Sequence, residues 1–207
     1  MHQEALTDTG KQLLPYLKLF RSFYLCGGTA LAIQIGHRVS VDFDFFSDDK
    51  ISKTLQNEIK KTLPENTIVQ LVVNNPDELT IFANETKVTF LYYPFPLIKP
   101  LINLNGLHVP TVQELAAIKA YTIGRRGEYK DYVDLYYLLY EKHTSLKEII
   151  EIARKKYKND FNDRLFLEQL IYLDDINLTD IRLLKQEHLT KEKLHEFFKK
   201  QIKSLSL

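Results

Sequence analysis

Several features that mark special classes of protein are scarce or missing in this chain. It has one cysteine, Cys26, in 207 residues, so no intramolecular disulfide can form, and the apolar neighbours of Cys26 indicate a buried thiol. No run approaches the roughly 18 apolar residues that a membrane-spanning helix needs. The first ten residues, MHQEALTDTG, lack the basic-then-apolar pattern of a signal peptide. We therefore expect a protein of the reducing cytoplasm with no membrane segment.

An excess of either charge is also missing. The 28 Lys and Arg residues nearly balance the 27 Asp and Glu residues, and the formal net charge is +1. Bulk electrostatics therefore predicts no strong non-specific binding to nucleic acid, and any such affinity must come from local patches. A hydrophobic content of 44% with 27% charged residues is typical of a globular protein. The length allows one large domain or two small lobes.

The most informative stretch is 25–47, LCGGTALAIQIGHRVSVDFDFFS. It predicts a short strand ending in a diglycine, a helix over 29–36, and a second strand. Because side chains alternate along a strand, the second strand should have one apolar face and one polar face. The apolar face would consist of Val39, Val41, Phe43 and Phe45, and the polar face of Ser40, Asp42 and Asp44.

This pattern indicates a site for a nucleoside triphosphate. Asp42 and Asp44 would place two like charges close together, and a hard divalent cation such as Mg²⁺ is the usual partner of paired carboxylates. Gly27 and Gly28 have no Cβ, so the backbone can turn sharply and approach a ligand. The free N–H groups of the following helix form a natural phosphate site.

The same residues carry a family resemblance. The runs Gly27-Gly28-Thr29-Ala30-Leu31, Gly36-His37-Arg38, Ser40 and Asp42-Phe43-Asp44-Phe45-Phe46 resemble the first motif of the AbiEii/AbiGii-type nucleotidyltransferases. These proteins are toxins of abortive-infection and related toxin–antitoxin pairs, within the DNA polymerase β-like superfamily. A lone diglycine or a lone DxD would be weak evidence, whereas their combination in one strand–helix–strand unit is much stronger.

A second group of residues lies in the later part of the chain. Lys119 interrupts an apolar run, and Lys130-Asp131-Tyr132-Val133-Asp134-Leu135 follows; together they resemble the later motifs of the same family. The resemblance implies that Lys119 and Asp131 complete the active site. Asp134 is interpreted as structural, and its spacing from Lys130 suits an i,i+4 ion pair.

Together, the residues and the resemblance define the predicted site. The predicted catalytic residues are Asp42, Asp44, Lys119 and Asp131. The predicted Mg²⁺ or Mn²⁺ ligands are Asp42 and Asp44. The predicted nucleotide contacts are Gly27, Gly28, Thr29, Arg38, Ser40 and Lys119.

One position departs from the superfamily pattern. Relatives often place a third carboxylate on a later strand in a Lys-Val-Asp-like context, whereas this chain has Lys87-Val88-Thr89. Thr89 therefore stands where an acid is expected, and Glu85 falls in a predicted turn. The loss weakens the case for two tightly held metals and removes the obvious general base. We expect Asp131 to supply the missing acid.

Each assignment has a simpler alternative. Asp42 and Asp44 could lie on a solvated strand face, and Gly27-Gly28 could be an ordinary turn. Arg38 suits a triphosphate contact or a charge partner equally well. The Lys119 side chain could simply extend its ammonium group to water. Asp131 could simply favour the positive end of a helix, and His37 could have a structural role.

The whole chain reads as an α+β protein, with a nucleotidyltransferase-like mixed sheet and flanking helices over 1–110 and an all-helical lobe over 111–207. We expect helices over 3–21 and 52–63, strands over 23–26 and 67–73, and a hairpin of 80–83 with 87–93. In the second lobe, a helix capped by Thr111 and Glu114 covers 112–123 and breaks at Gly124. Further helices are predicted over 129–143, 145–157, 160–173 and 190–204.

The predicted activity is transfer of a nucleotide from an NTP to an acceptor hydroxyl. The resemblance implies an RNA or tRNA 3′ end or a protein side chain as acceptor, and a cognate antitoxin as partner. Two alternatives remain open. One is a nucleotidyltransferase that acts on a small molecule, and the other is a catalytically degenerate fold that acts as a binding module.

Overall fold

The computed structural model describes residues 1–185 and 189–205. At its centre is a five-stranded sheet with the strand order β1-β2-β5-β4-β3, in which only β2 and β5 run parallel. The strands are β1 (Tyr24–Cys26), β2 (Phe43–Ser47), β3 (Val69–Asn74), β4 (Glu78–Ala83) and β5 (Thr86–Tyr92). The mixed sheet and the helices around it confirm the predicted α+β class.

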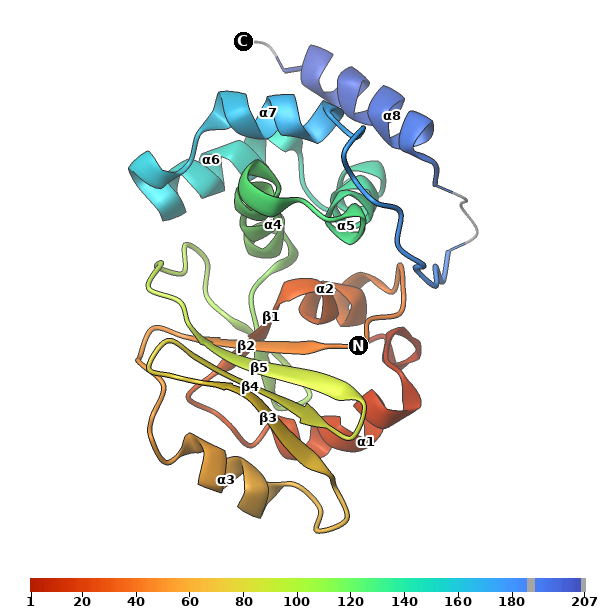
Figure 1. The fold of residues 1–207 in the computed structure, drawn as a ribbon. Coiled ribbons are helices and arrows are strands. Elements are labelled where there is room, and N and C mark those ends of the chain that lie inside the picture. Colours follow the sequence, from red (N-terminus) through yellow and green to blue (C-terminus); the bar gives the residue numbers. More distant parts are fainter. Residues whose placement is uncertain (186–188, 206–207) are drawn as a thin grey trace.

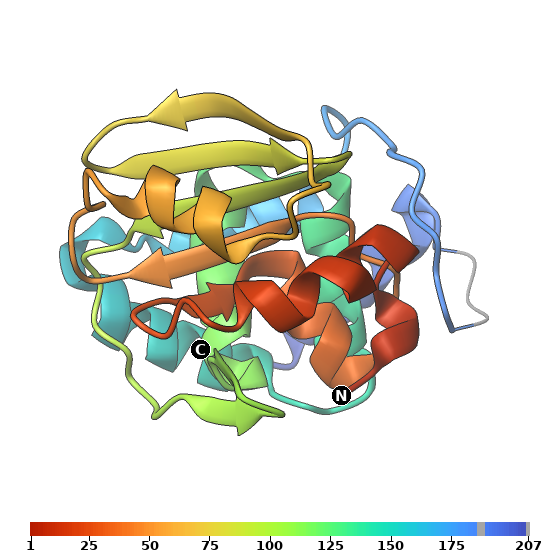
Figure 2. The same ribbon diagram turned by 90° about the horizontal axis from the view of Figure 1, so that it is seen from below.

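The two faces of the sheet are covered by different helices. Helices α1 (Asp8–Leu17) and α3 (Leu55–Thr62) lie on one face, which is turned toward the viewer in Figure 2. Helix α2 (Gly27–Ile35) lies on the other face, with α4 (Val112–Arg126) and α5 (Tyr129–Tyr140) beyond it (Figure 1). The remaining helices are α6 (Leu146–Tyr157), α7 (Asp163–Ile171) and α8 (Lys191–Lys203), with 3-10 turns at Gln3–Ala5 and Lys158–Asp160.

The alternation of β2 fixes which side chains face the helices. Phe43 and Phe45 are buried, and Phe43 lies against Gly10 of α1. Asp44, between them, therefore points to the opposite face, toward α2 and the later helices. The burial of the two aromatic rings holds the strand in this register, because a slip by one residue would bury the carboxylate and expose both rings.

The first part of the predicted second strand is not part of the sheet. β2 begins at Phe43, and Val41 is 55% exposed rather than buried. The preceding segment pairs with distant backbone instead: Ser40 N donates to Ala5 O, at 2.8 Å, and Val39 N donates to Arg182 O, also at 2.8 Å. Ser40 therefore does not share a strand face with the two aspartates, and this prediction is wrong.

The chain between α7 and α8 reaches back to this segment. Leu184 N donates to His37 O at 2.9 Å, and Arg38 and Leu183 form an antiparallel bridge. Together with the bond from Val39 to Arg182, these contacts join two parts of the chain that lie far apart in the sequence.

The predicted hairpin is confirmed as β4 and β5, joined by Asn84 with a positive φ of 54°. A second, shorter hairpin was not predicted; it consists of β6 (Ile102–Leu104) and β7 (Leu107–Val109). The division into lobes at residue 110 stays a prediction.

Other element bounds differ modestly from the prediction. Helix α1 begins only at Asp8, because the Thr7 side chain accepts a hydrogen bond from Gly10 N and caps it. Helix α4 continues through Gly124 to Arg126, so the predicted break at Gly124 is wrong. Within the ranges 1–185 and 189–205, no helix has the length and apolar character needed to cross a bilayer.

Candidate active site

The diglycine lies directly beside one of the two predicted metal ligands. β1 and β2 are antiparallel, and Cys26 stands opposite Asp44. Gly27 has a φ of +66°, and a Cβ atom at this position would lie 2.7 Å from Asp44 Oδ2. A Cβ atom at Gly28 would lie 2.4 Å from Arg38 Nη2. The missing side chains therefore make room for a carboxylate and a guanidinium at the start of α2.

Asp42 and Asp44 are both partly exposed, one just before β2 and one within it. Burial and the negative charge of Asp42 raise the pKa of Asp44. A divalent cation would relieve this repulsion, and the carboxylates supply the oxygen ligands that Mg²⁺ or Mn²⁺ prefers. The described part of the chain has no group of three or more His, Cys, Asp or Glu side chains that could hold a metal. The pair therefore fits a cation whose other ligands come from phosphate and water.

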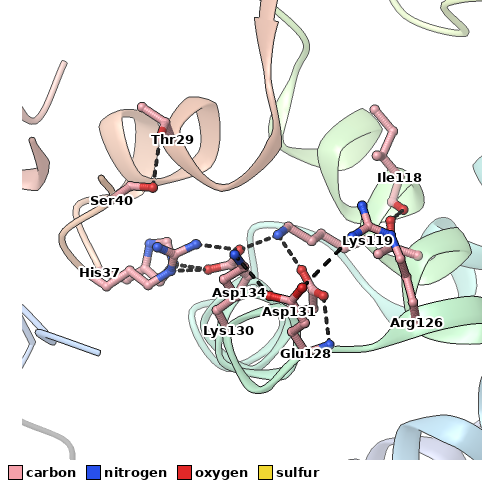
Figure 3. A network of polar contacts seen from close by, with 12 residues as sticks. Thr29, His37, Ser40, Ile118, Lys119, Arg126, Glu128, Lys130, Asp131 and Asp134 are labelled. Carbon is pink, nitrogen blue, oxygen red and sulfur yellow. Dashed lines mark hydrogen bonds and ion pairs between the residues drawn. The ribbon is translucent and has the colours of Figure 1, made fainter. Parts of the chain in front are cut away.

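Thr29 and Ser40 lie beside the aspartates rather than on their strand. Thr29 Oγ1 is 2.7 Å from Ser40 Oγ and also contacts the backbone carbonyl of Asp42. The contact between the two hydroxyls is drawn in Figure 3. Both side chains are buried, so in this structure they brace the turn that leads into β2.

Thr89 occupies the place next to Asp44 where a third acid was expected. It lies on β5, which is parallel to β2, and its Cα is paired with that of Asp44. Its hydroxyl is 3.4 Å from that of Thr80 on β4. Glu85 is exposed in the turn between β4 and β5. The sheet therefore offers no carboxylate beside Asp44 at this register position.

A buried carboxylate organises the helical side of the site. Asp134 is fully buried and accepts hydrogen bonds from Arg38 Nε to Oδ1, at 2.7 Å, and from Arg38 Nη2 to Oδ2, at 3.0 Å. His37 Nε2 lies 2.7 Å from Oδ1, and Lys119 Nζ lies 2.8 Å from Oδ2 (Figure 3). Burial alone would raise the pKa of Asp134, but the charges of Arg38 and Lys119 hold it well below its ordinary value.

Lys119 joins Asp134 to Asp131. Its ammonium group donates to Asp131 Oδ1 at 2.6 Å, while Asp131 Oδ2 accepts from Glu128 N at 3.0 Å and so caps α5. The predicted pair of Lys130 with Asp134 is wrong, because Lys130 contacts Glu128 Oε2 at 3.0 Å. Asp134 has three other partners in the protein interior.

These residues converge on one region. A Cβ atom at Gly28 would lie 3.7 Å from Asp134 Oδ2, and the charge of Lys119 acts on the carboxyl group of Asp44. The structure thus brings together the diglycine, Asp44, Lys119 and the buried acids of α5. In this structure Arg38 is the charge partner of Asp134, and His37 has a structural role beside the same carboxylate.

A second buried ion pair was missed by the sequence prediction. Glu114 Oε1 and Lys156 Nζ lie 2.8 Å apart, and both side chains are fully buried. Lys156 also donates to Pro96 O at 2.7 Å, and Glu114 accepts from Lys99 N at 3.2 Å. The pair fixes the 94–100 segment against α4 and α6, so the Glu114 carboxylate is not free to complete a capping box with Thr111. The signal in the sequence that could have revealed this pair is a charged residue within the apolar face of each helix, Glu114 in α4 and Lys156 in α6.

Comparisons with known proteins bear on the family and the fold of the chain. Residues 12–99 match the model of the family described as nucleotidyl transferase AbiEii toxin, type IV toxin–antitoxin system. An uncharacterized protein of Aquifex aeolicus is 32% identical over 194 residues, which cover 90% of this chain and 89% of that one.

Solved structures show the same fold. MenT4, a nucleotidyltransferase toxin of Mycobacterium tuberculosis, has a TM-score of 0.64 at 18% identity, covering 96% of this chain and 82% of its own. A candidate nucleotidyltransferase from Helicobacter pylori has a TM-score of 0.62 at 21% identity, covering 99% and 97%. The diglycine beside Asp44, the family match that spans both, and the shared fold lead to one conclusion: this chain belongs to the AbiEii family of nucleotidyltransferase toxins.

Proposed function

We propose that the protein transfers a nucleoside monophosphate from an NTP to an acceptor hydroxyl, and that this activity makes it a toxin. The observation that carries the proposal is the approach of the Gly27 backbone to Asp44, where a Cβ atom would lie 2.7 Å from the carboxylate. This close approach supports a phosphate site at the start of α2, directly beside an acidic side chain. Family membership supports the same activity.

Asp42 and Asp44 would hold Mg²⁺ or Mn²⁺, which supplies charge neutralisation at the phosphate oxygens. Backbone N–H groups after Gly28 would bind phosphate oxygens at the N-terminus of α2. Thr29 and Ser40 brace the turn that leads into β2 through their hydroxyl contact. Positioning and electrostatic stabilisation of this kind account for most of the catalysis in phosphoryl transfer.

In the reaction, the acceptor oxygen attacks the α-phosphorus, the bond to the β-phosphate oxygen breaks, and pyrophosphate leaves. The proton of the acceptor hydroxyl needs a base, and Asp131 is our candidate. In this structure its two carboxylate oxygens accept hydrogen bonds from Lys119 Nζ and from Glu128 N. Asp131 therefore also positions Lys119.

The proposal also covers the acceptor of the nucleotide, the partner protein and the cell compartment. We propose an RNA or tRNA 3′ end as the acceptor, with a protein side chain as the alternative, a cognate antitoxin as the controlling partner, and the cytoplasm as the place of action. Transfer of label from NTPs to a panel of RNA, protein and small-molecule acceptors distinguishes a macromolecular acceptor from a small-molecule one. Modification of small molecules alone would contradict the toxin assignment.

The test of the site is transfer of labelled nucleotide by Asp42→Ala and Asp44→Ala variants. We expect both to lose transfer while their far-UV circular dichroism and melting temperature stay close to those of the unaltered protein. Full activity in either variant would refute the metal assignment.

One observation favours a second candidate function, a catalytically degenerate binding module. Thr89 replaces the expected acid opposite Asp44. Calorimetry with Mg²⁺ and each NTP distinguishes the two, because an inactive module without the site should show no metal-dependent nucleotide binding.

A further inference from the structure

The two cations that the sequence assigns to the triphosphate are already occupied in the folded protein. Arg38 donates two hydrogen bonds to Asp134 and a third, from Nη1, to Val39 O at 3.2 Å. Lys119 is shared between Asp131 and Asp134. Arg38 is 4% exposed and Lys119 is 6% exposed. Moving either one to a ligand would leave the Asp134 carboxylate undercompensated in the interior, which is costly.

An accessible cation stands on the sheet beside Asp44. Lys87 lies on β5 two residues before Thr89, so the two side chains share one face of the strand. Thr89 is the neighbour of Asp44 across the strands, which places Lys87 on the same face as that carboxylate. Lys87 is exposed, and its ammonium group makes no hydrogen bond or ion pair with any residue whose placement the structure describes.

A second accessible cation faces the same point from the helices. Lys130 is in the first turn of α5 and directly precedes Asp131 (Figure 3). Its side chain is 45% exposed, and its partner Glu128, at 3.0 Å, is 49% exposed. A surface pair of this kind contributes little, so the ammonium group can exchange Glu128 for a more highly charged ligand.

The charges of Lys87 and Lys130 both reach Asp44. Each of them opposes the rise in the pKa of Asp44 that burial and Asp42 cause. The geometry agrees: Lys87 shares the face of Asp44 on the sheet, and the diglycine that approaches Asp44 also approaches Asp134 of α5, the helix that carries Lys130.

We propose that Lys87, from the sheet, and Lys130, from α5, bind the β- and γ-phosphates of the NTP, while Arg38 and Lys119 hold the helices around Asp134. The inference rests on the proposed function. The terminal phosphates carry the most concentrated negative charge of the substrate, and an ammonium group on a flexible stem binds phosphate as a point charge. Two cations around one acidic pair suit this compact anion better than an RNA backbone, which needs an extended basic track.

The test compares a Lys87→Ala/Lys130→Ala variant with a Lys53→Ala/Lys60→Ala control. Lys53 and Lys60 are exposed at and before α3, on the other side of the sheet. The control removes the same charge without touching the site. Titration calorimetry with NTP and with NMP, each with Mg²⁺, is the measurement. We expect the site variant to lose NTP affinity by about tenfold or more, because it loses two charge-assisted hydrogen bonds to phosphate.

NMP affinity should be unchanged in the site variant, and NTP affinity unchanged in the control. Lys87→Arg/Lys130→Arg should retain most NTP affinity, because the charge is kept. In transfer assays the alanine pair should raise KM for NTP more than it lowers kcat. Melting temperatures should not change, because Lys87 is exposed and Lys130 is held only by a surface ion pair.

Three results would overturn the inference. Unchanged NTP affinity in the site variant would do so, as would an equal loss for NMP. Unchanged NTP affinity with a loss of acceptor RNA binding would assign the lysines to the acceptor instead. If the unaltered protein bound no NTP at all, the proposed function would fail together with this inference. If it bound NTP and the two lysine substitutions left that affinity unchanged, this inference alone would fail.

Discussion

Asp134 and Arg38 are 96 residues apart in the sequence and form two parallel hydrogen bonds, of 2.7 and 3.0 Å, in the interior. Arg38 follows α2 in the sheet-containing part of the chain, and Asp134 belongs to α5. The pair therefore joins the segment that follows α2 to the helices that carry Lys119 and Asp131. Its geometry is bidentate, which fixes orientation as well as distance.

Removal of Asp134 should destabilise the protein strongly. In Asp134→Ala, Arg38 and Lys119 lose the carboxylate that compensates them in the interior, and a broken buried pair typically costs about 3–5 kcal/mol. Urea unfolding measures the change in the free energy of unfolding. The matched control is Asp180→Ala, because Asp180 is exposed. A loss for Asp134→Ala no larger than that of the control would contradict the role assigned to the pair.

Stability should fall as the pH is lowered from neutral. Burial lowers the pKa of His37 below its ordinary 6.5, against the opposing effect of Asp134, while Arg38 and Lys119 add to the lowering. The unfolded chain therefore binds a proton below pH 6.5 that folded His37 does not, at a cost of up to about 1.4 kcal/mol per pH unit. The pKa of Asp134 is also lowered, so its contribution is present above its unfolded value and is lost as the pH falls toward the folded one.

Urea midpoints between pH 8 and pH 4 measure this dependence. A His37→Gln variant removes the first of the two groups, and its stability should vary less between pH 7 and pH 5.5. An identical pH profile for both proteins would show that His37 does not contribute.

Two glycine substitutions should have opposite effects. In Gly27→Ala, the backbone keeps a φ of +66° that L residues adopt at a cost of about 1–2 kcal/mol, and the new methyl group meets Asp44. We expect lower stability and loss of nucleotide transfer. Gly124 lies inside α4 with nothing within 4 Å of its Cβ position, so Gly124→Ala should stabilise by up to about 1 kcal/mol. Thermal melts of both variants would contradict this account if their shifts had the same sign.

Cys26 should be unreactive in the folded protein. Burial raises the pKa of its thiol to about 12, and only the thiolate reacts readily. At pH 8 a thiol-specific aromatic disulfide should label the protein no faster than it unfolds, and urea should accelerate labelling to completion. Rapid labelling under native conditions would show that Cys26 is accessible.

Local patterns predicted the elements whose partners are close in sequence. The hairpin around Asn84 and the N-cap at Thr111 depend on a few neighbouring residues. Val39 and Val41 continued the strand alternation, but the structure pairs Val39 with Arg182, a contact that no local pattern contains. Gly124 lowers helix propensity without ending α4, because tertiary packing outweighs one weak residue.

In the candidate site, too, local patterns predicted some residues, whereas long-range contacts determine others. Gly27, Gly28, Asp42 and Asp44 stand out because their chemistry depends on spacing within one strand–helix–strand unit. The buried network around Asp134 could not be predicted. Lys130 and Asp134 have the spacing of an ordinary ion pair on a helix, and Arg38 comes from another part of the chain. An i,i+4 rule therefore selected Lys130 as its partner in place of Arg38.

The contact of residues 182–184 with residues 37–39 has a consequence for synthesis. The predicted site residues, from Gly27 to Asp131, all precede Arg182 in the chain. The segment around Arg38 obtains two of its backbone hydrogen bonds only from Arg182 and Leu184. A growing polypeptide that has not yet reached Arg182 thus contains every one of those side chains while its Arg38 segment still lacks these two hydrogen bonds, so the order of translation itself delays completion of the fold around them.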